Sequence, residues 1–458
     1  MPPGMYVDAA GHYQCQPFSI KAGDQISMKR IKSIDALEIL DSRGNPTIRV
    51  QLRLSNDQLI TASVPSGAST GRFEAFERRD GDQTRFNGKG VMGAVNAIRE
   101  QIGPVIIGMN PEDQSEIDKL MCRLDGTPNK SRLGANAIIG VSMAVARAAS
   151  YSKNIALYRH IASLAGRKPD RFRLPVPGLN VMNGGVHARN NTIDFQEFMI
   201  VPHNAKKFSE SLRWAAQTYQ SLKEILAERH LATTVGDEGG FAPNLKDDSQ
   251  ACEFIVQAIK QAGFEPGQDI GIALDPAATS FGSHAEGYVF KKSTGAHLTR
   301  AELIKFYEDW VDRYPILSIE DGVADDDWEG YAAMNRALGH RIQLVGDDNY
   351  VTNVKFIQRG IEEASTNAAL IKPNQIGTLT ETIEAIALCH KVGWATVVSH
   401  RSGETEDSFI ADMAVGCGCS QIKSGAPCRS ERLAKYNRLL EIEHELGDQA
   451  EFFSPFQK

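Results

Sequence analysis

The sequence predicts an α/β protein in which a (β/α)8-type barrel follows a smaller α+β domain. Two observations carry this prediction. The C-terminal two thirds contain eight short apolar runs, each ending in a polar or charged residue and each followed by a stretch that we expect to be helical. The N-terminal third instead passes from strand patterns to helix patterns.

The eight runs are spaced as barrel strands would be. They cover residues 174–181, 196–202, 270–275, 317–321, 342–348, 368–374, 395–400 and 420–425. Five of them carry a charged or imidazole side chain at or near their ends, and these residues follow one another at intervals of 27, 25, 28 and 23: Glu320, Asp347, Lys372, His400 and Lys423. Such an interval fits one strand, one helix and two short loops. Because carboxyl ends of barrel strands face one bowl, we expect these side chains to converge.

The N-terminal third begins with a hairpin pattern. Residues 47–54 alternate between apolar and polar side chains, which indicates a half-buried strand, and 59–64 form the returning strand after a turn at 55–57. Apolar residues at helical spacing predict a helix within 133–149. The polar, proline-bearing segment 166–170 marks the boundary between domains 28–168 and 169–458. Residues 1–27 hold few large apolar side chains and are predicted to be a flexible extension.

Composition narrows the function. A net charge of −7 over 458 residues argues against nucleic-acid or membrane-surface binding, because both partners are polyanionic. No apolar stretch is long enough to cross a membrane. Seven scattered cysteines favour a reducing compartment, so we expect a cytoplasmic protein. The pair Cys417 and Cys419 is interpreted as two small buried residues rather than a metal or redox site, because no other Cys or His cluster completes one.

Three carboxylates at run ends predict a metal site. Asp275, Glu320 and Asp347 each close an apolar run, and three hard oxygen ligands suit Mg2+. Each acid alone is explained better as the cap of the following helix. Three in related positions favour the metal.

Cationic side chains follow the next runs. Lys372 comes after an apolar strand, where burial would lower its pKa and allow it to act as a base, although a single lysine there is more often a surface group. Arg401 and Ser402 beside His400 fit a phosphate, and Lys423 adds positive charge. Three glycine-rich loops, at 66–71, 183–187 and 236–240, are candidates for mobile segments over the site.

Together these segments resemble the enolase family from about Ile31 to Phe453. The resemblance rests on an ordered set of motifs: DSRGNPT (41–47), PSGASTG (65–71), LDGTPNKSRLGANA (124–137), NGGVHA (183–188), QEFM (196–199), GDEGG (236–240), SIED (318–321), GDD (346–348), IKPNQIGT (371–378), SHRSGETED (399–407), IKSGAP (422–427) and RSERLAK (429–435). A single motif would be suggestive, whereas the ordered set is specific.

The resemblance implies a magnesium-dependent lyase that interconverts 2-phospho-D-glycerate and phosphoenolpyruvate. It implies that Lys372 takes the C2 proton and that Glu238, with Glu197 beside it, helps the C3 hydroxyl leave. Asp275, Glu320 and Asp347 match the ligands of a first Mg2+, and Ser69 matches a ligand of a second that arrives with substrate. The remaining matches are contacts to substrate: His187, Arg401 and Ser402 at the phosphate, Lys423 at the carboxylate, and His400 and Gln196 lining the pocket.

The resemblance also implies a homodimer, with larger assemblies of dimers left open, and a cytoplasmic location that can extend to the cell surface. Family members commonly place a glutamate and an arginine opposite each other across the dimer interface. The matching positions here are Arg49 and Glu441, so the charges are exchanged.

Some positions depart from the family pattern. Gly322 replaces a usual proline, Phe73 and Phe76 follow the 66–71 loop, and the stretch from 187 to 196 is one residue longer than usual. These changes flank the loops and leave two alternatives open. One is action on a related phospho- or phosphono-carboxylate. The other is a non-catalytic surface-binding protein, which would not need to keep every acid, base and ligand.

Overall fold

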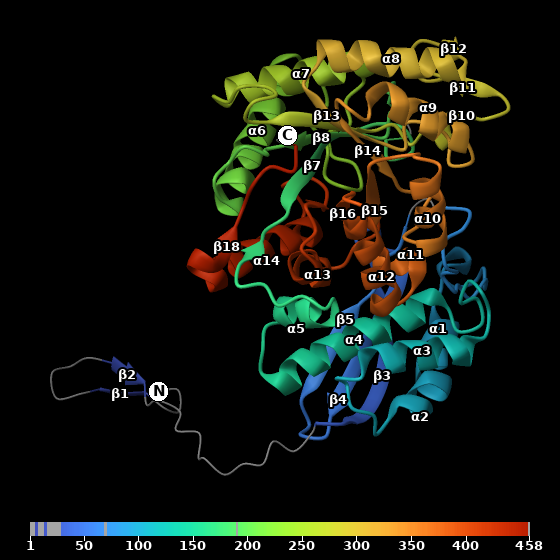
Figure 1. Cartoon of the computed structure of the whole chain (residues 1–458), viewed down its shortest axis with the longest axis vertical. Helices are drawn as coiled ribbons and strands as arrows, with labels where there is room; N and C mark the ends of the chain where they lie inside the picture. The colour runs from blue at the N-terminus through green and yellow to red at the C-terminus, as the bar shows by residue number, and fades with distance from the viewer. Residues whose placement is uncertain (1–4, 8–12, 16–28, 68–70, 189–190, 457–458) are drawn as a thin grey trace.

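The computed structural model describes residues 5–7, 13–15, 29–67, 71–188 and 191–456 (Figure 1). Within the N-terminal extension it describes β1 (Met5–Val7) and β2 (Tyr13–Cys15), which pair antiparallel. The rest of the segment predicted to be flexible lies outside the described residues, as does Ser69.

A three-stranded antiparallel sheet opens the main body of the chain. Its order is β3 (Ile31–Leu40), β4 (Pro46–Leu54) and β5 (Leu59–Ser63). The two predicted strands are confirmed as β4 and β5. Strand β3 was not predicted, because its buried positions, such as Ile31, Ile34 and Ala36, do not follow one regular alternation.

Helices cover one face of this sheet. The predicted helix is confirmed as α4 (Ala135–Lys153), which is buried over most of its length and packs on β4 and β5. Gly140 permits this close packing, since a Cβ there would lie 2.9 Å from side-chain carbons of Val50 and Val64. The other helices of this part are α1 (Met92–Ala97), a π-helical turn (Ile98–Ile102), α2 (Gly103–Ile106), α3 (Gln114–Asp125) and α5 (Leu157–Leu164).

Eight strands then close into a barrel. They are β7 (Val176–Asn183), β8 (Glu197–Val201), β9 (Gly271–Asp275), β13 (Ile316–Glu320), β14 (Gln343–Gly346), β15 (Ala368–Ile371), β16 (Ala395–Ser399) and β17 (Gln421–Lys423). All eight predicted runs are barrel strands, and the predicted fold class is confirmed.

One strand runs against the others. β8 pairs antiparallel with both β7 and β9, and the described residues between β7 and β8 contain no helix. The expectation of a helix after the first run is therefore wrong. The reversal has a consequence for the site: the first residue of β8, Glu197, lies at the same mouth of the barrel as the carboxyl ends of its neighbours.

Below its mouth, the barrel interior holds apolar clusters and a buried polar group, in which Gln421 donates to Gln343 at 2.7 Å and Gln343 donates to Ser318 at 3.3 Å. Two small clusters are separate from the main core, one of Val176, Met199, Val201 and Ala273, the other of Val345, Ala368, Leu370 and Val397. Ala273 and Leu370 precede Asp275 and Lys372 by two residues, so the strand alternation points each pair to the same side. These clusters support the polar side chains from beneath.

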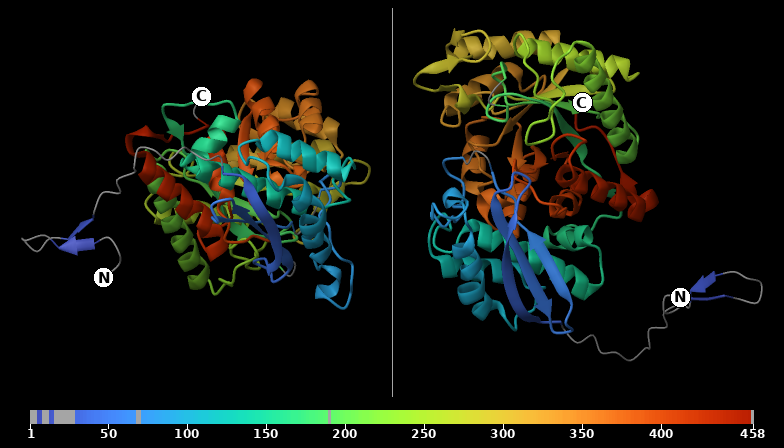
Figure 2. Two further views of the ribbon diagram at one scale, coloured as in Figure 1. Left: turned by 90° about the horizontal axis from the view of Figure 1, so that it is seen from below. Right: turned by 180° about the vertical axis from the view of Figure 1, so that it is seen from behind.

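Helices surround the barrel, and the three-stranded sheet with α3 and α4 lies against one end of the molecule (Figures 1 and 2). The barrel helices are α6 (Phe208–Glu228), α7 (Asp248–Gln261), α8 (Arg300–Arg313), α9 (Trp328–Leu338), α10 (Val354–Glu362), α11 (Pro373–Ile376), α12 (Leu379–Lys391), α13 (Phe409–Cys417) and α14 (Ser430–Leu446). Short strands β6 (Phe172–Arg173) and β18 (Ala450–Glu451) pair beside the barrel, and β10 (Gly282–Ser283), β11 (Gly287–Val289) and β12 (His297–Leu298) form a small sheet.

Two further observations bear on the sequence analysis. Cys417 and Cys419 are free and buried, as interpreted. Among the residues described, we find no helix with the length and apolar character needed to cross a membrane.

Candidate active site

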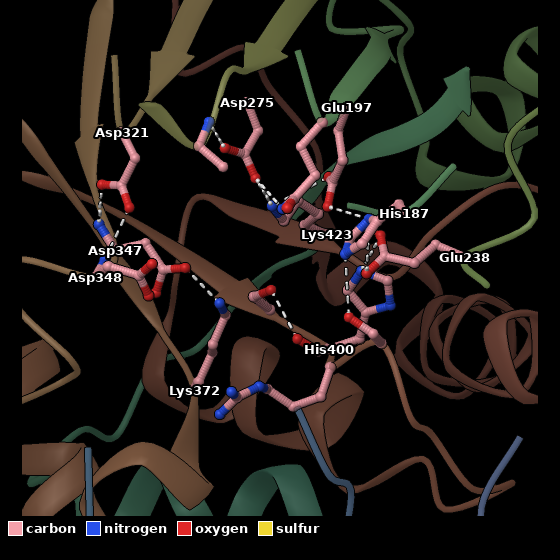
Figure 3. Close-up of a pocket in the computed structure, with 15 residues that line it drawn as sticks. His187, Glu197, Glu238, Asp275, Asp321, Asp347, Asp348, Lys372, His400 and Lys423 are labelled. Atoms are coloured by element: carbon pink, nitrogen blue, oxygen red, sulfur yellow. Dashed lines mark hydrogen bonds and ion pairs between the residues drawn. The ribbon is translucent and has the colours of Figure 1, made fainter. Parts of the chain in front are cut away.

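A polar pocket opens at the mouth of the barrel (Figure 3). It is lined by twelve residues that carry a charge, an imidazole or an amide group: His187, Gln196, Glu197, Glu238, Asp275, Asp321, Asp347, Asp348, Lys372, His400, Arg401 and Lys423. Ser399, Ser402 and Ala277 complete the wall. The free volume between them is only ≈ 40 Å³. Side chains of opposite charge contact one another across it.

The barrel strands position these groups. Asp275, Glu320 and Lys423 are the last residues of β9, β13 and β17, while Asp347, Lys372 and His400 each come directly after a strand. The structure thus brings together at one mouth the residues that sequence reasoning placed at strand ends. Of the thirteen candidate site residues, only Ser69 lies outside the described part of the chain.

Lys423 lies at the centre of three buried carboxylates. Its Nζ is 2.8 and 2.9 Å from the two oxygens of Glu320, 3.2 Å from Glu197 Oε2 and 3.5 Å from Asp275 Oδ2. Burial alone would lower the pKa of Lys423, but these carboxylates outweigh it and raise the pKa well above its usual value. Burial, together with repulsion between the acids, raises the pKa of Asp275 to about 7 and that of Glu320 to about 8.

Lys372 forms a second lysine–carboxylate contact in the pocket, with Asp347. Its Nζ forms a short hydrogen bond to Asp347 Oδ2, and Gln375 donates to the other carboxylate oxygen at 3.0 Å. The sequence suggested a lowered pKa for Lys372. The structure contradicts this, because the Asp347 charge outweighs the effect of burial and raises the pKa.

Acidic groups that could hold a metal ion occur twice in this pocket. Ligand atoms of Asp321, Asp347 and Asp348 lie within 4.8 Å of one another, and so do those of His187, Glu197 and Glu238. Of the predicted ligands, Asp347 belongs to the first group, whereas Asp275 and Glu320 contact Lys423. Oxygen donors at this density, all buried or nearly so, suit a hard divalent cation.

Asp321 organises the first group. Its two oxygens accept hydrogen bonds from the backbone N–H groups of Asp347 and Asp348, both at 2.9 Å, and Tyr331 donates to it at 2.8 Å. Its φ of 44° is unusual for a residue other than glycine, and Gly322 follows it.

A second acidic pair lies across the pocket. Glu238 Oε2 accepts a hydrogen bond from Asn180 at 3.2 Å and lies 3.2 Å from His400 Nε2. Burial and the neighbouring Glu238 raise the pKa of Glu197 well above its usual range. For Glu238 burial acts in the same direction, but the imidazoles of His400 and His187 outweigh it and lower the pKa. Of the two acids, Glu197 is therefore the one that takes up a proton more easily.

The predicted phosphate contacts form a third region. Arg401 makes a two-point ion pair with Glu74, and Ser402 Oγ lies 3.3 Å from His187 Nε2. Gln196 donates to Asp275 Oδ2 at 3.5 Å. The planar cation predicted to hold a phosphate therefore already contacts a carboxylate of the chain.

Sequence reasoning missed four residues that shape the pocket. Asp321 and Asp348 stand in the quoted motifs SIED and GDD, where only the first acid of each was given a role. Arg432 stands in RSERLAK without a role, and Glu74 follows the 66–71 loop. Two adjacent acids after a barrel strand would have been a signal for Asp348, whereas nothing local marks Glu74 or Arg432.

Comparison with known proteins decides the family. The family model of the enolase C-terminal TIM barrel domain matches residues 171–456, and that of the enolase N-terminal domain matches residues 31–161. The chain belongs to the enolase family. It is 56% identical to Enolase 1 of Methylococcus capsulatus over 424 aligned residues. These residues make up 92% of this chain and 99% of that protein.

Other enolases agree over the same length. The enolase of Desulfotalea psychrophila is 52% identical to this chain, and the aligned residues cover 92% of this chain and 99% of that protein. Enolase 2 of Methanospirillum hungatei is 53% identical, with 92% of this chain and 97% of that protein aligned. Membership of the enolase family confirms the resemblance drawn from the motifs, and with it the enzyme class, a lyase.

Proposed function

We propose that the protein catalyses the reversible dehydration of 2-phospho-D-glycerate to phosphoenolpyruvate. The observation that carries this proposal is the arrangement of the barrel mouth: Lys372 lies on one side, Glu238 and Glu197 on the other, and carboxylates and cations fill the space between (Figure 3). A base and an acid on opposite sides of a substrate are what removal of a proton and a hydroxyl from adjacent carbons requires.

The first step would be removal of the C2 proton by Lys372. This proton is weakly acidic, because its loss places a second negative charge on the substrate carboxylate. Lys423 would face that carboxylate and stabilise the dianion more than the ground state, which is how an electrostatic contact accelerates a reaction. Arg401, with His187 and Ser402, would hold the phosphate, and Gln196 and His400 would line the pocket.

The second step would be departure of the C3 hydroxyl with a proton from the Glu238 and Glu197 pair. Within this pair the surroundings favour the protonated form at Glu197 and the charged form at Glu238, because they raise the pKa of the first and lower that of the second. Glu238 is proposed to face the hydroxyl and act as its acid, with Glu197 beside it as the source of the proton.

Magnesium is part of the proposal. Asp275, Glu320 and Asp347 would hold one Mg2+, and Ser69 would contribute to a second. Such ions would supply positive charge that stabilises the dianion. Lys372 needs a lower pKa to act as the base, and neutralisation of the Asp347 charge would lower it. A Lys or His base with one or two Mg2+ is the established pattern of the enolase superfamily, carried over here. Dense acidic groups at the barrel mouth support it.

A spectrophotometric assay tests the reaction. Purified protein with 2-phospho-D-glycerate should form phosphoenolpyruvate in the presence of Mg2+ and not after chelation. A phosphono-carboxylate analogue should be turned over more slowly, and no turnover of either compound would contradict the proposal.

We also propose a homodimer that works in the cytoplasm, with domains at 28–168 and 169–458. The N-terminal family model ends at residue 161 and the C-terminal one begins at residue 171, on either side of this boundary.

The proposed dimer contact involves Arg49 and Glu441. Within one chain, Arg49 contacts Glu406 and Ser63, while Glu441 pairs with Arg438 at 3.0 Å. Native mass spectrometry gives the assembly state. The single variant Arg49→Glu should weaken the dimer, and the double variant Arg49→Glu with Glu441→Arg should restore it. Equal dimer fractions in the wild type and both variants would refute the pairing of Arg49 with Glu441.

A further inference from the structure

Arg432 is a fully buried cation behind the active site. It lies in the first turn of α14, and its side chain has no exposed surface. Gly425 makes room for it, because a Cβ there would lie 2.9 Å from Arg432 Cδ and 2.6 Å from the Glu238 carbonyl oxygen. A cation this deeply buried needs several hydrogen-bond acceptors.

The guanidinium group finds these acceptors on separate segments of the chain. Nη1 donates to the Arg401 carbonyl at 2.6 Å, and Nη2 donates to the carbonyls of Ser402 at 2.6 Å and Asp237 at 3.0 Å. One planar group thus joins the loop that carries Glu238 to the loop that carries His400. The rigid fork of an arginine suits this task, whereas a lysine presents a single point charge.

One more contact determines the chemistry of His400. Nη1 of Arg432 forms a short hydrogen bond with His400 Nδ1. An arginine can only donate, so Nδ1 must be the acceptor and carry no proton. In a neutral imidazole the proton is then on Nε2, the nitrogen that lies 3.2 Å from Glu238 Oε2.

We propose that Arg432 is a positioning residue that fixes His400 as the Nε2–H tautomer, so that His400 presents a donor toward Glu238 and the reacting side of the pocket. In this state His400 cannot act as a base toward substrate. Its Nε2 lies 3.2 Å from the same Glu238 oxygen that accepts a hydrogen bond from Asn180.

Charge supports the same assignment. Burial, with the nearby Arg432 cation, lowers the pKa of His400 to about 3 although Glu238 acts in the opposite direction. The ring is thus neutral at neutral pH, as a single tautomer requires. The tautomer follows from the hydrogen bond and does not depend on this value.

The tautomer can be measured directly by long-range ¹H–¹⁵N NMR of the histidine rings in the full-length protein. His400→Gln identifies the His400 signals. We expect an unprotonated Nδ1 and a protonated Nε2 in the wild-type protein. A protonated Nδ1 would overturn the proposal without any variant at Arg432, so the test does not depend on how such variants fold.

Variants then show whether Arg432 determines the tautomer of His400. Arg432→Met removes every donor, and we expect a mixture of both tautomers at His400 with a kcat lower by about 100-fold, as for the loss of one aligned donor. Arg432→Lys keeps the charge and should recover part of both effects. An unchanged His400 tautomer in Arg432→Met would overturn the proposal.

Lys435 on the same helix provides a matched control. It is buried, and it donates to Glu404 at 2.7 Å and to the Thr405 carbonyl at 2.6 Å without reaching His400. Lys435→Met should lose stability yet keep the Nε2–H tautomer, and mixed tautomers in this variant would contradict a specific role of Arg432. The kinetic part rests on the proposed function, whereas the NMR part stands without it. A protein inactive toward 2-phospho-D-glycerate but with the expected tautomers would therefore refute only the function.

Discussion

Glu74 and Arg401 form a two-point ion pair in which both nitrogen–oxygen distances are 3.0 Å. The two side chains are 7% and 4% exposed, so this is a buried pair. Gly71 donates its backbone N–H to Glu74 at 3.0 Å, which holds the carboxylate beside the loop that precedes it. Glu74 therefore satisfies the cation that is proposed to bind the substrate phosphate.

The first prediction follows from this competition. Glu74→Gln leaves the Arg401 charge buried without its carboxylate, so the free energy of unfolding should fall by about 3 kcal/mol without ligand. Inorganic phosphate should restore stability more strongly in the variant than in the wild type, because the anion no longer competes with Glu74. Thermal unfolding with and without phosphate measures both effects.

Glu77 serves as the control for this experiment. It belongs to the same segment but pairs with Arg79 at 2.7 Å rather than with Arg401. Glu77→Gln should respond to phosphate as the wild type does. Equal phosphate-induced shifts in Glu74→Gln and Glu77→Gln would show that Glu74 does not occupy the phosphate site.

The second prediction concerns the base. Lys372→Ala should remain folded, lose exchange of the substrate C2 proton with solvent deuterium, and lower kcat by about 10²–10⁴-fold, the usual contribution of a general base. Lys355→Ala, which removes an exposed lysine on α10, should leave exchange unchanged. Exchange measured by NMR at the wild-type rate in Lys372→Ala would exclude Lys372 as the base.

The third prediction separates the acid from the base. Glu238 lies across the pocket from Lys372 (Figure 3), where Asn180 and His400 contact it. Glu238→Gln should therefore block formation of phosphoenolpyruvate while C2 exchange stays measurable, because only the later step loses its acid. Parallel loss of exchange and turnover in a folded variant would assign Glu238 to the earlier step.

Much of the fold was predictable because barrel strands are short apolar runs with regular spacing. The direction of β8 was not predictable, because the pattern of the run QEFMIVP is that of a strand in either direction. Only the antiparallel pairing of β8 with β7 and β9 determines its direction. The glycine-rich loop at 183–187 was the local signal against a helix after this run, and the described residues between β7 and β8 contain none.

The site, too, has residues that the sequence could predict and residues that it could not. Residues at strand ends, such as Asp275 and Lys423, were predictable because the barrel itself brings strand ends together. Glu74 was not, because it reaches Arg401 across 327 positions of sequence through packing between two parts of the chain. The raised pKa of Lys372 was missed for a related reason: its direct contact with Asp347, on the neighbouring strand, is set by side-chain geometry.

The last prediction concerns His160 and the acid stability of the protein. His160 lies on α5, has no exposed surface, and neither ring nitrogen has a hydrogen-bond partner among the described residues. Burial, with a smaller effect of Lys153, lowers its pKa to about 4 from a usual value of 6.5. A buried imidazole without an acceptor is stable only while it is neutral.

The sign of the effect follows from proton binding. Between pH 6.5 and 4 the unfolded chain binds a proton at this histidine and the folded chain does not, so acidification favours unfolding. Stability from this residue is complete above pH 6.5 and is lost as the pH falls toward 4. The loss amounts to about 3 kcal/mol at 1.36 kcal/mol per pKa unit.

His160→Leu removes the titrating ring and keeps an apolar side chain in its place. Chemical unfolding of wild type and variant at several pH values between 7 and 4, at one protein concentration, isolates this residue, because all other groups titrate alike in both. The difference in unfolding free energy should be constant above pH 6.5 and should shift in favour of the variant by about 3 kcal/mol on approaching pH 4. His297→Leu, which removes an exposed histidine on β12, should follow the wild type throughout. Parallel curves for wild type and His160→Leu over the whole range would show that burial of His160 does not limit acid stability.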